Sequence, residues 1–347
     1  MNAPVQTSST TGVQTVTMAK AINLGLRRSL ENDPKVMIMG EDVGRLGGVF
    51  RVTDGLQKDF GEHRVVDTPL AESGIVGTAI GLALRGYRPV CEIQFDGFVY
   101  PATDQIVSQL AKMRYRSRGS VTLPVVIRIP FGGGIGAVEH HSESPEVFFA
   151  HTAGLRVVAC ADPADAFAMI QLAIVSDDPV IFFEPKRRYW EKAEVDTAAP
   201  LSDALPLDKA RIVHDGDDVT LLSYGPLVRT CLEAALAARE DGRSIEVIDL
   251  RSLSPLDMAT IEASVARTGR CVVAHEAPVY AGLGGEIAAR VTEHCFYSLE
   301  APVLRVGGQY RIPTAHLMRI IGIQERPVYA VDLDDDDLTA PLDARNG

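Results

Sequence analysis

Short apolar runs alternate with longer segments of helical pattern along most of this 347-residue chain. The runs are rich in Val and Ile and nearly continuous, which is typical of strands buried on both faces of a parallel sheet. We expect strands at 36–39, 64–67, 90–95, 125–129, 155–159 and 180–183, with helices near 18–31, 72–85, 101–116 and 163–176. This order predicts an α/β fold with a doubly wound parallel sheet.

The alternation stops between residues 184 and 210, where the sequence is charged, contains prolines and has no apolar period. A second series follows, with strands expected at 219–223, 244–249, 271–274 and 303–306 and helices near 226–240, 256–267 and 283–296. We therefore predict two α/β domains. The expected organisation is a disordered lead-in at 1–16, domains at 17–184 and 211–330, a linker at 185–210 and an acidic tail at 331–347.

The charge balance restricts the partners. The chain has 46 Asp and Glu against 34 Lys and Arg, a formal net charge of −12, so nucleic acid and anionic membranes are not expected to bind. A small basic protein domain fits better. The five cysteines are scattered without a CxxC pair, and no apolar run approaches ~18 residues. Together with an N-terminal stretch that does not look like a targeting signal, this predicts reduced thiols and a cytoplasmic location.

The first candidate motif is the segment TPLAESGIVG at 68–77, at an expected strand-to-helix junction. Ligands bind outside the carboxyl ends of strands in parallel sheets. The alternative is structural: Thr68 caps the helix, Pro69 is its first residue and Glu72 complements its dipole. However, Glu72 begins an apolar segment, and a buried carboxylate needs a partner.

The second candidate is the glycine-rich stretch FGGGIGAVEHHS at 131–142, after an expected strand. It lacks the spacing of a phosphate-binding loop, and a flexible turn is the alternative. Adjacent histidines without a third ligand at metal-binding spacing do not indicate a metal site. A histidine here is better placed as a general acid–base group or an oxyanion donor.

The third candidate is the strand end EIQFDGFVYP at 92–101, where an aromatic side chain either joins the core or stacks on a flat heterocycle. Two basic stretches have simpler interpretations. We expect KMRYRSR at 112–118 to complement a helix C-terminus and KRR at 186–188 to be solvated surface.

The blocks MGEDVGRLGGVFRVTDGL, TPLAESGIVG, EIQFDGFVYPATDQIVSQLAKMRYRS and HHSESPEVFFAHTAGLRVV carry a resemblance. With DPVIFFEPKRRY, EVIDLRSLSPLD and TGRCVVAHEAP, they resemble the β subunit of a thiamine-diphosphate-dependent 2-oxo acid dehydrogenase E1 component. The forms HSESPEVFF and GGVFRVTDGL are most similar to the branched-chain (2-oxoisovalerate) type. The resemblance implies a transketolase-like fold, in which a pyrimidine-binding domain precedes a C-terminal transketolase-type domain.

The resemblance also implies roles for particular residues. Glu72 matches the carboxylate that bonds the cofactor's aminopyrimidine, and Phe98 matches the aromatic residue that packs on the pyrimidine. Leu70 and Gln94 match neighbours of the cofactor, and His141 matches the active-site histidine, which would orient the 2-oxo acid and assist acyl transfer to E2. A K⁺ site through main-chain carbonyls maps onto Leu123, Val125, Val126, Ala173, Ser176 and Asp178. The implied partners are an α subunit in an α2β2 heterotetramer and the subunit-binding and lipoyl domains of E2.

Two departures from the family pattern shape these expectations. The chain has no Gly-Asp-Gly, and its only asparagines are Asn2, Asn23, Asn32 and Asn346. We therefore expect the Mg²⁺-diphosphate half-site to come from the α subunit. After residue 308, QYRIP replaces the usual Asp-x-Pro-x-Pro stretch and an acidic run replaces a closing helix. We expect the chain beyond about residue 330 to be poorly ordered and its contacts there to differ from those of relatives.

Two other functions remain open at this point. A pyruvate or acetoin dehydrogenase E1 β subunit would share the chemistry but not the substrate. A non-catalytic subunit of the electron-transfer flavoprotein type would have similar sheets, although the chain lacks a dinucleotide-binding fingerprint.

Overall fold

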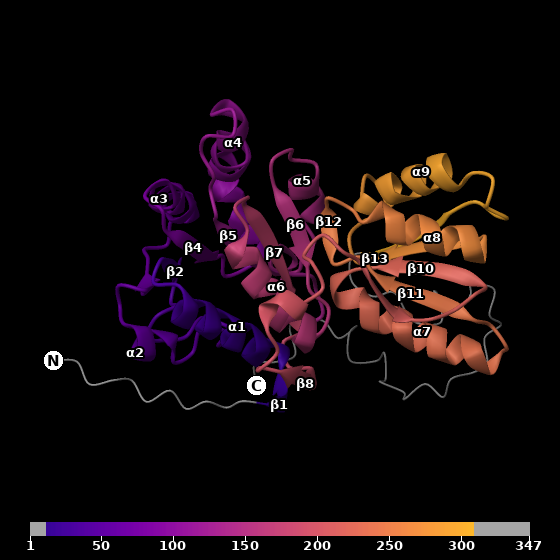
Figure 1. Ribbon diagram of the computed structural model, residues 1–347, viewed down its shortest axis with the longest axis horizontal. Helices are drawn as coiled ribbons and strands as arrows, with labels where there is room; N and C mark the ends of the chain where they lie inside the picture. Colours follow the sequence, from indigo (N-terminus) through magenta and orange to yellow (C-terminus); the bar gives the residue numbers. More distant parts are fainter. Residues whose placement is uncertain (1–11, 309–347) are drawn as a thin grey trace, which may run out of the picture.

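The structure is a computed structural model that describes residues 12–308, and it contains two α/β domains side by side (Figure 1). The expected acidic tail and the departure after residue 308 lie outside the described residues. The first domain is built on a seven-stranded sheet of order β12-β6-β7-β5-β4-β2-β3, in which β12 alone is antiparallel to its neighbour. Its strands are β2 (Val36–Gly40), β3 (Val65–Asp67), β4 (Arg88–Glu92), β5 (Val126–Phe131), β6 (Arg156–Ala159), β7 (Val180–Pro185) and β12 (Ser252–Ser254).

Alternate residues along these strands face two different helix layers. On one face, α1 (Met18–Asn32) and α6 (Pro163–Val175) pack against each other and cover Ile38, Val126 and Phe182. The other face carries α3 (Glu72–Leu84), the 3-10 segment η1 (Asp96–Ala102), the π-helical segment η2 (Gln105–Leu110) and α5 (Glu146–Ala150). The short helices α2 (Leu56–Phe60) and α4 (Met113–Arg116) and the 3-10 turn η3 (Glu139–His141) lie in the connections.

The second domain is a five-stranded sheet of order β14-β13-β10-β11-β9, with β9 antiparallel. Its strands are β9 (Arg211–His214), β10 (Val219–Ser223), β11 (Ile245–Asp249), β13 (Cys271–His275) and β14 (Leu304–Gly307). After the 3-10 turn η6 (Gly225–Leu227), α7 (Val228–Glu240) covers one face. The helices α8 (Met258–Thr268) and α9 (Leu283–Cys295) cover the other (Figure 1).

Residues 13–16 are not a disordered lead-in, contrary to expectation. They belong to β1 (Val13–Thr17), which pairs antiparallel with β8 (Lys192–Asp196) from the expected linker. The linker also contains the 3-10 turns η4 (Lys186–Arg188) and η5 (Leu201–Asp203). The apolar anchor is Val195, which packs with Ala21 of α1 and Phe167 of α6. With one buried valine in β8 and no buried residue in β1, the ribbon leaves too weak a sequence signal to be predicted.

A continuous helix over 101–116 was also a wrong prediction. This segment is divided among η1, η2 and α4. Pro101 lies within η1, where its missing amide hydrogen removes one helical hydrogen bond. The broken geometry lets the aromatic residues after β4 stay at the sheet edge instead of joining a regular helix.

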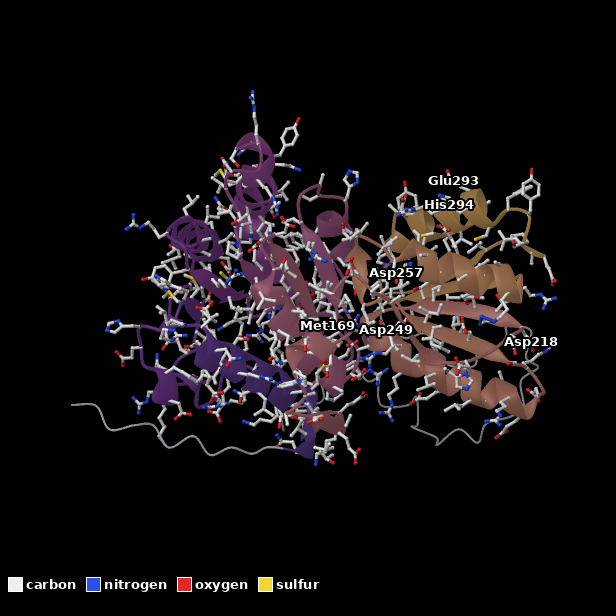
Figure 2. All side chains as sticks on the ribbon, in the orientation of Figure 1. Met169, Asp218, Asp249, Asp257, Glu293 and His294 are labelled. Atoms are coloured by element: carbon white, nitrogen blue, oxygen red, sulfur yellow. The ribbon has the colours of Figure 1, made fainter. Side chains whose placement is uncertain are left out.

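The carboxyl ends of β10, β11 and β13 abut the first domain. Figure 2 shows Asp249, at the end of β11, on the side of its sheet nearest α6, which carries Met169. The buried guanidinium of Arg251 bonds Asp165 of α6 with an Nε–Oδ2 distance of 2.6 Å. The Tyr224 hydroxyl donates to Glu146 Oε1 of α5 at 2.5 Å. These contacts fix the two domains against each other. Within residues 12–308, no helix is long and apolar enough to cross a membrane.

We expect the stability of the protein to depend on pH because of the carboxyl group of Glu146, which lies where the two domains meet. Burial raises the pKa of Glu146 to about 7 from its ordinary 4.5, although the hydrogen bond from Tyr224 opposes the shift. The native state therefore binds this proton more tightly than the unfolded state. As a result, the free energy of unfolding should fall as pH rises from about 4.5 to about 7. Gln keeps the acceptor for Tyr224 without a charge. We expect Glu146→Gln to be more stable than the parent at pH 8 by up to about 3 kcal/mol, and nearly equal to it at pH 4.5.

Denaturant unfolding of both proteins at the two pH values measures this difference. A stability gap that is the same at both pH values would show that Glu146 does not titrate on unfolding.

Candidate active site

Five connections of the first domain meet at the carboxyl edge of its sheet. They follow β2, β3, β4, β5 and β7, and their polar residues include Glu41, Thr68, Gln94, His141 and Lys186. Adjacent parallel strands bring these loops together, which is where open α/β sheets bind ligands. The edge therefore gathers Glu72, Gln94, Phe98 and His141, as the sequence predicts.

Glu72 is the first residue of α3, and its side chain is buried, with the residue 7% exposed. The N-cap position is Ala71, so Thr68 and Pro69 do not cap and begin the helix as the structural alternative proposed. Among the described residues, the Glu72 carboxylate has no hydrogen-bond or ion-pair partner. The nearby Glu41 is itself affected, since burial and the Glu72 charge both raise the pKa of Glu41. A poorly exposed carboxylate without a partner within residues 12–308 is well placed to accept a hydrogen bond from a ligand or another chain.

Aromatic rings gather across the site from α3. Phe98 of η1 is half-buried and meets the His141 ring edge-on, with centroids 5.0 Å apart. Phe95 stacks on the other side of His141 at 4.1 Å and an interplanar angle of 21°. His140 stays exposed, although its ring lies 4.2 Å from that of His141. Both histidines have aromatic neighbours, since the Phe98 ring also lies 6.3 Å from that of His140, but His141 makes the closer contacts and is the less exposed of the two.

Leu70 and Gln94 are less constrained. Leu70 is 79% exposed, which is unusual for a leucine beside a buried carboxylate. The Gln94 amide makes only long hydrogen bonds, 3.5 Å to the Glu41 carbonyl and 3.4 Å to Asp42 Oδ2. Within residues 12–308, Leu70 is largely exposed and Gln94 has only these long hydrogen bonds, so both can contact a ligand or a partner subunit.

The stretch 186–188 is not solvated surface, contrary to expectation. Lys186 is fully buried and forms an ion pair with the equally buried Asp96. Arg187 reaches Glu276 at 3.4 Å, and Arg188 donates to the Pro226 carbonyl at 2.7 Å. These basic residues follow β7 directly. The carboxylates that pair with Lys186 and Arg187 come from distant segments, whereas Arg188 pairs with the nearby Glu191. Their position at a strand's carboxyl end was the available sequence signal, and the run of like charge concealed it.

The six carbonyl positions expected for K⁺ lie before and within β5 and around the end of α6. Several of these oxygens already accept a hydrogen bond: Val125 from Val180 at 2.9 Å and Ala173 from Ser176 at 3.2 Å. The Ser176 carbonyl accepts from the Arg88 guanidinium at 3.2 Å, and a cation there repels another. Within residues 12–308, no cluster of three or more His, Cys, Asp or Glu side chains is arranged to hold a metal. The K⁺ site stays a prediction.

Comparison with known proteins assigns each of the two domains to a family. Residues 14–191 match the family model "Transketolase, pyrimidine binding domain", and residues 208–328 match "Transketolase, C-terminal domain". A solved "Split gene transketolase, inactive beta4 tetramer" shares the fold with a TM-score of 0.67 at 22% identity, covering 89% of this chain and 94% of that one.

Curated relatives are much closer in sequence. The pyruvate dehydrogenase E1 component subunit beta of Leifsonia xyli subsp. xyli is 63% identical, covering 88% of this chain and 90% of the relative. The 3-methyl-2-oxobutanoate dehydrogenase subunit beta of Mycobacterium tuberculosis is 55% identical, covering 85% and 84%. The 2-oxoisovalerate dehydrogenase subunit beta of Pseudomonas aeruginosa is 47% identical, covering 85% and 88%.

Proposed function

This chain belongs to the family of E1 β subunits of 2-oxo acid dehydrogenases, and from that premise we propose that it forms one half of a thiamine-diphosphate site. With a separate α subunit in an α2β2 heterotetramer, it decarboxylates a branched-chain 2-oxo acid. The acyl group and two electrons pass to the lipoyl disulfide of E2. The observation that carries the proposal is the Glu72 side chain, 7% exposed and without a partner within residues 12–308, at the same edge of the sheet as Phe98 and His141. Family membership removes the alternative of a flavoprotein-type binding subunit.

The residues at the sheet edge fit the pyrimidine end of this cofactor. When bound, thiamine diphosphate supplies a thiazolium carbon that becomes a nucleophile on losing its proton. Glu72 would hold a proton at the pyrimidine ring nitrogen, which gives the orphaned carboxylate its missing donor. Phe98 would offer its ring to the pyrimidine, and Leu70 and Gln94 would border it. His141 would orient the 2-oxo acid and assist transfer of the acyl group.

The other end of the cofactor requires a second polypeptide. A diphosphate with Mg²⁺ needs oxygen ligands. The chain lacks a Gly-Asp-Gly motif and has no asparagine between residues 33 and 345. We assign the Mg²⁺-diphosphate half-site to the α subunit. The net charge of −12 also favours salt-sensitive docking to a basic binding domain of E2. We place the assembly in the cytoplasm.

Two types within the family, the branched-chain type and the pyruvate type, differ in their substrate. The HSESPEVFF and GGVFRVTDGL blocks and the relatives from M. tuberculosis and P. aeruginosa favour branched-chain substrates. The 63% identity to a pyruvate dehydrogenase subunit favours pyruvate. We expect kcat/KM of the assembled enzyme to be about tenfold or more higher for 3-methyl-2-oxobutanoate than for pyruvate, because an apolar pocket gains binding energy from the added methyl groups. A higher kcat/KM for pyruvate would make the chain a pyruvate-type subunit and leave the family unchanged.

Replacing the two adjacent histidines should have unequal effects. We expect His141→Ala to keep heterotetramer assembly and cofactor binding but to lower overall oxidation by roughly 10²-fold or more, because its ring lies at the reacting end of the site. His140→Ala is the matched control and should retain most activity, since its ring is exposed. Reduction of NAD⁺ by the reconstituted complex measures both. An equal loss in the two variants would assign the loop a structural role only.

A further inference from the structure

A buried ion pair lies beneath the loop that carries His141. The Lys186 ammonium follows β7, and the Asp96 carboxylate begins η1. Both side chains are fully buried, and they form a salt bridge with each other. Burial raises the pKa of Asp96 and lowers the pKa of Lys186, in each case against the attraction of the partner charge. Removing these two charges from water therefore costs free energy. A contribution to stability does not by itself explain why the pair is buried here.

Each member of the pair also holds the backbone of the histidine loop. Lys186 Nζ donates to the main-chain carbonyl of His141 at 2.6 Å. The second oxygen of Asp96 accepts the main-chain amide of Glu143. The two partners of this salt bridge thus hold the loop at two points, the carbonyl of His141 and the amide of Glu143, which lie on either side of Ser142. The salt bridge ties that loop to η1, which follows β4, and to the residue that follows β7.

The same two residues fix the ring against which His141 packs. Asp96 follows Phe95 directly, and the Lys186 ammonium lies 5.5 Å from the centroid of the Phe95 ring. Phe95 in turn stacks on the His141 imidazole at 4.1 Å. The backbone and the side chain of His141 are therefore both set by contacts that end at Lys186 and Asp96.

We propose that Lys186 and Asp96 are positioning residues for His141, holding its imidazole at the reacting end of the cofactor site. The inference rests on the proposed function, because it needs the role given there to His141. Neither residue touches the substrate. Their contribution to catalysis passes through the histidine, so it should disappear when the histidine is removed.

The variant that tests this is the neutral pair Asp96→Asn with Lys186→Met. Asn keeps an acceptor for the Glu143 amide and Met keeps the length of the lysine stem, so no uncompensated charge remains buried. The matched control is Asp165→Asn with Arg251→Met, which neutralises a second buried ion pair whose contacts lie at the domain junction. Both variants are studied in the reconstituted α2β2 enzyme.

We expect the Asp96/Lys186 variant to transfer acyl groups to lipoyl domains at least tenfold more slowly than the parent, whereas the control pair stays within threefold of it. Exchange of the C2 proton of bound cofactor, which depends on Glu72, should not change. Hydrogen exchange of the amides at 139–143 should become faster in the Asp96/Lys186 variant only. Adding His141→Ala to that variant should reduce acyl transfer no further than His141→Ala alone.

Independent, additive losses in this double-mutant cycle would overturn the proposal, as would unchanged hydrogen exchange at 139–143. An effect of the same size in the control pair would also overturn it, by showing that any lost buried ion pair has this consequence. If His141→Ala itself leaves acyl transfer intact while the 139–143 amides exchange faster in the pair variant, the role of His141 in the proposed function fails. In that case the pair holds the loop in place but does not contribute to catalysis through His141.

Discussion

Glu72→Gln should lower kcat of the assembled enzyme by roughly 10²–10⁴-fold while the heterotetramer still forms. Gln has the same shape as Glu but cannot hold a shared proton at the pyrimidine nitrogen. The carboxylate is buried and has no partner among the described residues, so the loss falls on the chemistry and not on a contact within the fold. Decarboxylation measured with an artificial electron acceptor gives kcat, and NMR gives the exchange rate of the cofactor's C2 proton.

The alternative role of Glu72 predicts a different result. If the side chain only complements the dipole of α3, its neutralisation costs about 0.3–1 kcal/mol of stability and leaves proton exchange nearly normal. Near-normal exchange in the Gln variant would remove Glu72 from the mechanism. Glu41→Gln is a useful control, because this neighbouring carboxyl is also buried but belongs to a different loop. We expect its effect on the exchange rate to be much smaller.

Much of the fold follows from the sequence because its strands are buried on both faces. The strand β7 begins with a continuous apolar run that ends at Glu184, and β5 is apolar apart from Arg128, so the positions of these strands and the carboxyl edge of the sheet are visible in the sequence. The strand ends that precede Glu72 and His141 place both residues near this edge, whereas their roles come from the resemblance to the E1 β family and stay predictions. The short antiparallel ribbon of β1 and β8 was missed because it buries only Val195 and contains no apolar run.

The support beneath the site could not be predicted from the sequence. Asp96 and Lys186 are 90 positions apart, and their pairing depends on the order of β4, β5 and β7 in the sheet. The link between Glu146 and Tyr224 depends on how the two domains dock. A run of three basic residues looks solvated until the fold places carboxylates against it. Pairings of this kind are decided by tertiary structure and leave no local pattern.

The second large effect concerns the division of the site between two chains. We expect the β chain alone to show no decarboxylase activity, and addition of the α subunit to restore it. In our proposal Glu72 and the aromatic rings at the sheet edge hold the pyrimidine, whereas the sequence lacks the Gly-Asp-Gly and asparagine that would bind Mg²⁺-diphosphate. The diphosphate carries most of the cofactor's charge, so losing its half-site removes most of the binding energy.

Isothermal titration calorimetry of thiamine diphosphate with Mg²⁺ measures this division directly. It is performed on the isolated β chain and on the reconstituted α2β2 enzyme under the same conditions. We predict binding by the heterotetramer and only weak binding, with Kd well above the micromolar range, by the β chain alone. Micromolar or tighter affinity of the β chain alone would contradict the account, since the chain would then hold both ends of the cofactor.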